Sequence, residues 1–276
     1  MRVSALTSVL VMAALGFCGC GKGLAATSRP ASSRPATRPA GEEVTVLSLN
    51  VLKPIWQKPG QPSWNIRREK VFELLKELKP GFFCTQEEAD RQVQDILQAD
   101  SAYKEVGHRG QSGAIFYRHE RWQLLEAGRC DFPKWPRYFL WARFKDKATG
   151  KRIDVYTTHV PFLGQMTAAA RMNAVGMIAR HIADRKEPQT PVVLTGDFNS
   201  TPDTPPMRYL TGEAAGSPVK LIYAHKDVPV PSGPKQSMGI DHILTLPGMK
   251  VIDSGVARGI WESGSDHPAV YAVLRW

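Results

Sequence analysis

The stretch PVVLTGDFNSTP, residues 191–202, joins an apolar run to a polar turn and decides the class of fold. Its first five residues are apolar or β-branched, as expected of a buried strand. Asp197 and Asn199 follow two positions apart, so in an extended chain their side chains point the same way. A carboxylate so placed can orient and deprotonate a water molecule, while the neighbouring amide donates a hydrogen bond to phosphate.

Short apolar runs that end in polar residues recur along the chain. They predict strands over 44–51, 81–86, 113–117, 122–126, 137–144, 152–158, 191–195, 240–246, 250–256 and 268–274. Helical spacing of apolar residues predicts helices over 64–78, 89–99 and 168–183. Because strands outnumber helices and no repeat has a fixed period, we expect a sheet-rich α/β sandwich with helices outside.

Polar residues at the strand ends are candidates for one common site, because strand ends converge along the edge of a sheet. The candidates are Asn50, Glu87, His159, Asp197, Asn199, Asp241, Asp266 and His267. Taken singly, each has an ordinary interpretation as a turn residue, a helix cap or a structural histidine. One site accounts for all of them together.

Metal binding is expected at the oxygen-bearing residues of this set. Glu87 and Asn50, helped by Asp266, offer the ligands that Mg²⁺ or Mn²⁺ prefers.

The two histidines suit such a metal less well. We expect His159 and His267 to donate to a phosphate oxygen as imidazolium groups, which would stabilise charge in the transition state. Asp241 is expected to accept a hydrogen bond from His267 and to keep that ring charged and oriented. The set therefore predicts metal-assisted attack of water on phosphorus.

Six motifs appear in the order shown by the endonuclease/exonuclease/phosphatase (DNase I-like) superfamily, which this chain resembles over about residues 44–276. They are SLNV (48–51), TQEE (85–88), TTH (157–159), TGDFNSTP (195–202), IDHI (240–243) and SDHP (265–268). The resemblance implies a four-layer α/β/β/α sandwich of two mixed sheets flanked by helices. It also implies hydrolysis of phosphoric esters with Mg²⁺, Mn²⁺ being possible.

The resemblance also implies a role for each matching residue. Glu87 resembles the principal metal ligand, with Asn50 beside it, and Asp266 resembles a second carboxylate on the metal side. Asp197 resembles the base that activates water, and Asp241 resembles the partner of His267. His159 and Asn199 resemble residues that contact phosphate. Arg109 and Tyr117 flank the segment where relatives often place substrate contacts. The chain departs from the family pattern at Thr85 and Glu88, which replace commoner apolar residues, and at 111–113 and 236–238.

The first 42 residues are predicted to lie outside the catalytic domain, which we place at 43–276. Residues 1–19 have the layout of an export signal. Residues 17–20, FCGC, resemble a bacterial lipobox, so Cys20 is expected to carry lipid; cleavage near Ala25 or Ala26 is the alternative. Residues 20–42, rich in Pro, Ala, Ser and Arg, are predicted to be a disordered linker.

The charge of the chain bears on its substrate. The 276 residues carry a formal net charge of +10, which at first suggests nucleic acid, but residues 1–40 contribute half of it. We therefore expect an exported, membrane-anchored, monomeric hydrolase of a phosphodiester or phosphomonoester, in a lipid, a sugar phosphate or nucleic acid. An extracytoplasmic DNase I-like nuclease and a non-catalytic phosphate-binding module are the alternatives.

Two cysteines, Cys84 and Cys130, lie in the predicted body. Export permits a disulfide between them, whereas a buried thiol is the default expectation.

Overall fold

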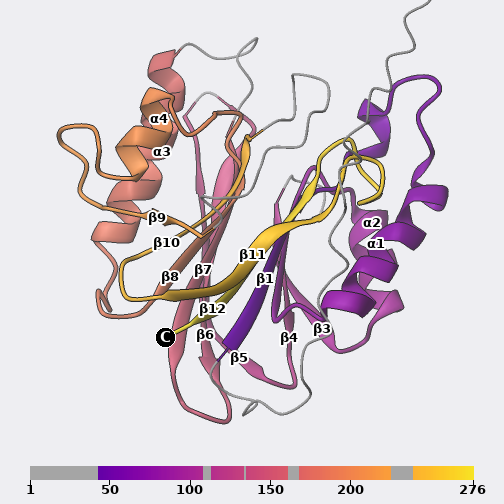
Figure 1. Cartoon of the computed structure of the whole chain (residues 1–276), viewed down its shortest axis with the longest axis horizontal. Helices are drawn as coiled ribbons and strands as arrows, with labels where there is room; N and C mark the ends of the chain where they lie inside the picture. The colour runs from indigo at the N-terminus through magenta and orange to yellow at the C-terminus, as the bar shows by residue number, and fades with distance from the viewer. Residues whose placement is uncertain (1–42, 108–112, 134, 161–167, 225–238) are drawn as a thin grey trace, which may run out of the picture. The chain divides into compact units, whose positions relative to one another are not determined.

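The computed structural model describes residues 43–107, 113–133, 135–160, 168–224 and 239–276 (Figure 1). The predicted export signal at 1–19, lipidation at Cys20, the linker at 20–42 and the substrate-binding role of Arg109 lie outside the described residues. No helix within the described ranges is both long and apolar enough to span a bilayer.

The described residues form two six-stranded sheets. The first contains, in spatial order, β11 (Lys250–Arg258), β12 (Ala269–Arg275), β1 (Glu43–Asn50), β2 (Phe82–Gln86), β4 (Ala114–Arg118) and β3 (Tyr103–Gly107). The second contains β5 (Trp122–Asp131), β6 (Tyr138–Asp146), β7 (Arg152–His159), β8 (Val192–Asp197), β10 (Asp241–Thr245) and β9 (Ile222–Tyr223). Each sheet has one parallel pair, β1 with β2 and β7 with β8, beside antiparallel neighbours.

Helices cover the outer faces of both sheets (Figure 1). The helices α1 (Trp64–Leu78) and α2 (Asp90–Ala99) flank the first sheet, and α3 (Ala168–Ala183) and α4 (Pro205–Leu210) flank the second. A 3-10 turn, η1 (Pro54–Trp56), follows β1. The predicted four-layer α/β/β/α sandwich is therefore confirmed.

Three clusters of buried apolar side chains fill the spaces between the four layers. In β1, Val46 points into the cluster between the sheets, whereas the next residue, Leu47, packs beneath α1 and α2. A third cluster joins Leu194 of β8 to Ile178 of α3. Because inner strands bury both faces, their sequences are continuously apolar, which is why they were recognisable.

Several elements differ from the expected ones. The strand β3, the helix α4 and the two-residue strand β9 were not predicted, and β5 extends to Asp131. These elements lie at sheet edges or are short, so the apolar periodicity is too brief to indicate them.

Cys84 and Cys130 are both free thiols, so the disulfide alternative is wrong. The expectation of a buried thiol holds for Cys84, whereas Cys130 is only partly buried. Cys84 is fully buried between the sheets, and burial raises the pKa of its thiol to about 12.

Candidate active site

Three of the predicted site residues form a row across the second sheet. His159 at the end of β7 lies opposite Asp197 at the end of β8 in the strand register, and Asp197 in turn lies opposite Asp241 at the start of β10. Neighbouring strands lie about 4.8 Å apart, so the register alone brings these side chains together.

The row requires a glycine beside Asp197. Gly196 has φ +149°, and a Cβ atom there would lie 2.1 Å from the carbonyl oxygen of Thr158. Any side chain would force β7 and β8 apart at their catalytic ends.

The first sheet supplies the other half of the site. Asn50 ends β1 opposite Gln86, and Glu87 follows immediately in the left-handed conformation with φ +63°. The Oγ atom of Ser265 donates to the carbonyl oxygen of Asn50 at 2.5 Å, which ties the segment with Asp266 and His267 to the same strand end. The two halves meet where Asn50 Nδ2 donates to Asp197 Oδ2 at 3.2 Å.

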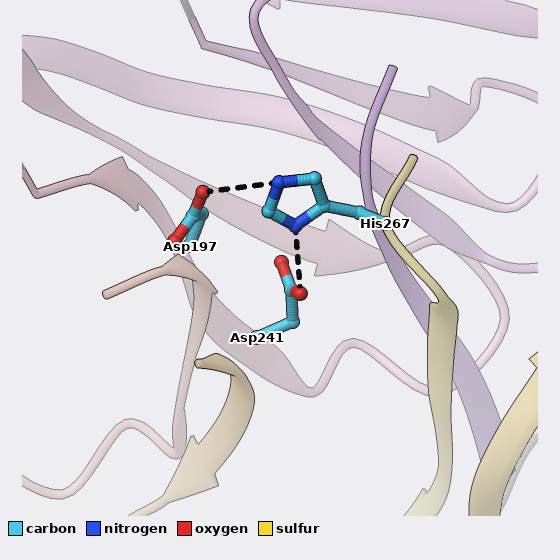
Figure 2. Close-up of side chains that lie close together, drawn as sticks. All are labelled: Asp197, Asp241 and His267. Carbon is cyan, nitrogen blue, oxygen red and sulfur yellow. Dashed lines mark hydrogen bonds and ion pairs between the residues drawn. The ribbon is translucent and has the colours of Figure 1, made fainter. Parts of the chain in front are cut away.

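The ring of His267 lies between two carboxylates (Figure 2). Its Nδ1 is 2.9 Å from Oδ2 of Asp241, and its Nε2 is 3.8 Å from Oδ2 of Asp197. Burial alone lowers the pKa of His267, but the charge and hydrogen bond of Asp241, with Asp197 and Asp266, outweigh it and raise that pKa to about 10. The expected partnership of Asp241 with a charged His267 agrees with this geometry.

Asp197 is buried, and burial raises the pKa of its carboxyl above the ordinary value, although the charge of His267 opposes the shift. Its Oδ2 also lies 3.4 Å from Nε2 of His159. A carboxylate whose pKa approaches neutrality is a better proton acceptor than an ordinary aspartate.

The surroundings of His159 disfavour the imidazolium form that was expected of both histidines. Nη1 of Arg137 donates to Nδ1 of His159, which must therefore carry a lone pair. Burial, followed by the charges of Arg137 and His267, lowers the pKa of His159 well below its ordinary value. The hydrogen is then on Nε2, which lies 3.8 Å from Oε1 of Glu87 and faces the interior of the site.

The residues predicted to bind a metal fit a hard divalent cation. Glu87 is mostly buried, and burial raises the pKa of its carboxyl, as does the charge of Asp266; Asn50, His267 and Arg137 act in the opposite direction. The carboxylates of Glu87 and Asp266 are the oxygen donors that Mg²⁺ prefers, and a cation there would relieve the buried negative charge. The amide of Asn50 presents its Nδ2 to Asp197 and its Oδ1 to the N–H of Leu52, so it would have to turn for its oxygen to reach the metal.

A second possible ligand set overlaps the first. Asp197, Asp241 and His267 each offer one atom within 4.8 Å of the others. His267 is charged in this arrangement, however, and both nitrogens of an imidazolium carry protons, so the ring would have to lose one to bind a metal. The donors around Glu87 fit Mg²⁺ better.

Asn199 is placed differently from the expectation of an extended chain. Its φ is +48°, its backbone N–H donates to Asp197 Oδ1 at 2.9 Å, and its Nδ2 donates to the carbonyl oxygen of Val160 at 2.6 Å. The residue thus closes the turn that orients Asp197. Its contact with phosphate stays a prediction.

Tyr117 does not line the site, and its predicted substrate contact is wrong. The side chain is buried between the sheets, with its ring 4.8 Å from that of Phe144. It pairs with Phe82 at the start of β2, five residues before Glu87, which corresponds to roughly 16 Å along the strand. The apolar alternation of β4 points this residue into the core.

Three residues of the site region were not recognised in the sequence. Glu88 is buried and accepts hydrogen bonds from Thr85 Oγ1 at 3.0 Å and from the N–H of Gly113 at 2.5 Å; burial raises its pKa to about 7. Thr85 and Glu88 are the two departures from the family pattern, and that joint departure was the available signal. Arg67 and Arg137 had no such signal, because their partners are far away in sequence.

The fold and the site define the class of protein. A sandwich of two mixed sheets, with carboxylates, histidines and amides gathered at one edge, is the architecture of a DNase I-like phosphoric ester hydrolase. A model of the endonuclease/exonuclease/phosphatase family matches residues 47–267, and the chain belongs to this family, as the motifs predicted.

Comparison with individual proteins agrees with this assignment. Protein angel of Drosophila melanogaster is 29% identical over 171 residues, which cover 55% of this chain and 48% of that protein; the chain thus spans about half of its length. An endonuclease/exonuclease/phosphatase from Bacteroides vulgatus has the same fold, with a TM-score of 0.73 and 23% identity over 84% of this chain and 98% of that one. A mannosyl-6-phosphatase of Bacteroides thetaiotaomicron also has this fold, with a TM-score of 0.70 and 20% identity over 84% of this chain and 100% of that one.

Proposed function

We propose that this chain is an exported, lipid-anchored phosphoesterase that uses Mg²⁺ to hydrolyse a phosphodiester or phosphomonoester. The observation that carries the proposal is the position of Asp197. Its carboxylate contacts Asn50 and neutral His159 and faces charged His267, all at one edge of the sandwich. A proton acceptor thus lies beside two groups that can donate to a phosphoryl oxygen.

Each residue has a defined part in the proposed reaction. Asp197 orients the attacking water and accepts its proton, for which its raised pKa is suited. His267, held by Asp241, donates to the phosphoryl group and stabilises the negative charge that develops there. His159 presents its Nε2–H to the same space.

Three residues of the site would hold the proposed metal. Glu87, Asn50 and Asp266 would hold Mg²⁺, which when bound polarises the phosphoryl oxygen and lowers the cost of adding charge to it. Mn²⁺ suits the same donors.

The substrate is proposed as a phosphate ester of a lipid or sugar. Residues 41–276 have a net charge of +5, which suits a small anionic substrate and does not require a polyanion. The structural similarity to a mannosyl-6-phosphatase supports testing sugar phosphates first.

Hydrolysis by the mature chain tests the proposal directly. We would compare p-nitrophenyl phosphate, its bis ester, sugar phosphates, phospholipid vesicles and plasmid DNA in the presence of Mg²⁺, Mn²⁺ or EDTA. Metal-dependent turnover of a small ester or lipid is expected. Cleavage of DNA alone would favour the extracytoplasmic nuclease, and no turnover with either metal would favour a phosphate-binding module.

Export is proposed from residues 1–19 and from Cys20. Fractionation of bacteria that express the whole chain should place it in the membrane, and Cys20→Ala should release it from the membrane. Equal partition of both chains would contradict the lipid anchor.

A further inference from the structure

A cation that has no part in the reaction described above lies beside the catalytic row. Arg137 precedes β6 directly, and its Nη1 donates to Nδ1 of His159. The same guanidinium lies over the indole of Trp56 in η1, with Cζ 5.5 Å from the ring centroid. Two segments that are 81 positions apart in the sequence thus meet at the rim of the site.

The electrostatic neighbours of Arg137 place its charge near the site. Burial lowers its pKa, and the carboxylates of Glu87, Asp197 and Glu88 act against that shift. Two of these carboxylates belong to the proposed catalytic and metal-binding groups. An arginine remains charged under these conditions, so its positive charge lies at the site itself.

Two other arginines of the body are neutralised by a direct ion pair. Arg143 binds Asp154 through Nε at 2.8 Å, and Arg118 contacts Asp100 at 3.2 Å. Among the ion pairs between described residues, none includes Arg137. No described carboxylate thus contacts its guanidinium directly, although Glu87, Asp197 and Glu88 lie near enough to act on its charge.

A guanidinium has five N–H groups in a planar fork that matches phosphate geometry. In Arg137, one nitrogen is engaged by His159 and one face by Trp56, an arrangement that restrains the group while leaving donors along its edge. Lys53, whose Nζ lies 5.6 Å from the same indole centroid, adds positive charge to this rim.

We propose that Arg137 binds the phosphoryl group of the substrate and that Trp56 holds its guanidinium in position for this contact. The assignment rests on the proposed function, since it adds a substrate-binding residue to the same site. Trp56 acts through Arg137 and is a positioning residue. Its side chain is 42% exposed, so its removal sacrifices little of the core.

Binding of inorganic phosphate to the mature chain tests the proposal without requiring turnover. Titration calorimetry with and without Mg²⁺ would compare the wild type with Arg137→Met, Arg137→Lys and Trp56→Leu. A hydrogen bond to a charged group contributes about 1.5–3 kcal/mol, so Arg137→Met should weaken binding by about tenfold to a hundredfold. Arg137→Lys keeps the charge but loses the fork, and should weaken binding less.

A matched control is available at the opposite end of the first sheet. Arg118 lies over Tyr103 at 5.2 Å, much as Arg137 lies over Trp56, but it pairs with Asp100 away from the site. Arg118→Met should leave phosphate affinity within about twofold of the wild type. The effect of Trp56→Leu should largely disappear in the Arg137→Met background, because positioning requires the group that is positioned.

The outcomes separate this inference from the proposed function. Unchanged phosphate affinity in Arg137→Met would overturn the inference even if the wild type hydrolyses esters, and so would a wild type that binds no phosphate with or without Mg²⁺. Phosphate binding that depends on Arg137 in a chain that hydrolyses no ester would support the inference and reject the proposed function. If Arg137→Met fails to unfold cooperatively, Arg137→Lys and Trp56→Leu decide: wild-type affinity in both overturns the assignment.

Discussion

Asn50 Nδ2 donates to Oδ2 of Asp197 at 3.2 Å, and this hydrogen bond joins the catalytic ends of the two sheets. Both side chains are buried, so neither could be left without its partner at low cost. Oδ1 of Asn50 accepts from the N–H of Leu52 at 3.1 Å, which fixes the orientation of the amide. The relationship connects the proposed metal-binding half of the site to the proposed base.

Asp197→Asn should abolish most activity without destabilising the protein. The substitution conserves shape but removes the proton acceptor, so kcat should fall by about 10²- to 10⁴-fold. Burial raises the pKa of this carboxyl, so removing its charge offsets the loss of one acceptor, because both oxygens of Asp197 accept hydrogen bonds, from Asn50 Nδ2 and from the N–H of Asn199; the Tm at pH 7.5 should therefore stay close to that of the wild type. Wild-type kcat in the variant would show that Asp197 is not the base.

Mg²⁺ should stabilise the wild type but not Glu87→Gln. A ligand that binds only the folded state raises the free energy of unfolding, by about 2.7 kcal/mol at a hundredfold excess over its Kd. Glu87 provides the buried carboxylate of the proposed metal site, so its amide variant should lose this response, and EDTA should reverse the response of the wild type. An equal shift of Tm in both proteins would place the metal elsewhere.

Gly196→Ala should lower the free energy of unfolding by about 2–4 kcal/mol, because the new Cβ meets the carbonyl oxygen of Thr158. Gly60→Ala is the matched control. Gly60 also has positive φ, +83°, but has no atom within 4 Å of the added carbon, so only backbone strain of about 1 kcal/mol applies. Urea denaturation of both variants measures the difference, and equal losses would contradict the steric account.

Arg67→Met should weaken both stability and catalysis. The buried guanidinium donates to the carbonyl oxygens of Val51 at 2.8 Å, Leu52 at 2.8 Å, Pro62 at 3.1 Å and Gly264 at 2.7 Å. It thereby holds the loop before His267 against the end of β1.

Unpaired carbonyl groups should reduce the free energy of unfolding of Arg67→Met by about 2–5 kcal/mol. Arg68→Met, at the partly exposed neighbour that contacts Asp95 at 3.4 Å, should cost under about 1 kcal/mol. Denaturation and kcat would be measured on both variants. A folded Arg67→Met with normal kcat would show that Arg67 does not position the site.

Stability should fall with acidification partly because of His181 in α3. Its Nδ1 lies 3.1 Å from the hydroxyl of Tyr156, and burial lowers its pKa, with Arg185 contributing and Asp154 opposing. The unfolded chain therefore binds a proton first, and this contribution to stability is present above a pH of about 6.5 and is lost as pH falls below it.

His181→Gln keeps a polar partner for Tyr156 but cannot titrate. Its free energy of unfolding should decline less than that of the wild type between pH 7 and pH 5, as measured by urea denaturation at each pH. Parallel declines would exclude His181 as the source.

The secondary structure was predictable where a local pattern is long. The helices at 64–78 and 168–183 have the bounds that their apolar spacing predicts, since one face of each packs on a sheet. Strands such as β8 were recognisable because both of their faces are buried. The edge strand β3 and the short α4 were missed because few of their residues contribute to a pattern.

The candidate site was predictable as a set of residues but not as an arrangement. Polar residues that interrupt apolar runs identified Asn50, Glu87, Asp197 and His267, and the structure brings them to one edge. Tyr117 was misplaced because its position near a motif says nothing about which face of β4 it occupies.

The sequence by itself determined the family, the layered fold and the types of side chain available for phosphoester chemistry, because these depend on local apolar patterns and short motifs. Only the tertiary structure decided that His159 is neutral and His267 charged, since each charge state depends on a partner distant in sequence, Arg137 for one and Asp241 for the other. Protonation responds to distances of a few ångströms and to burial, and both arise only when the two sheets pack together.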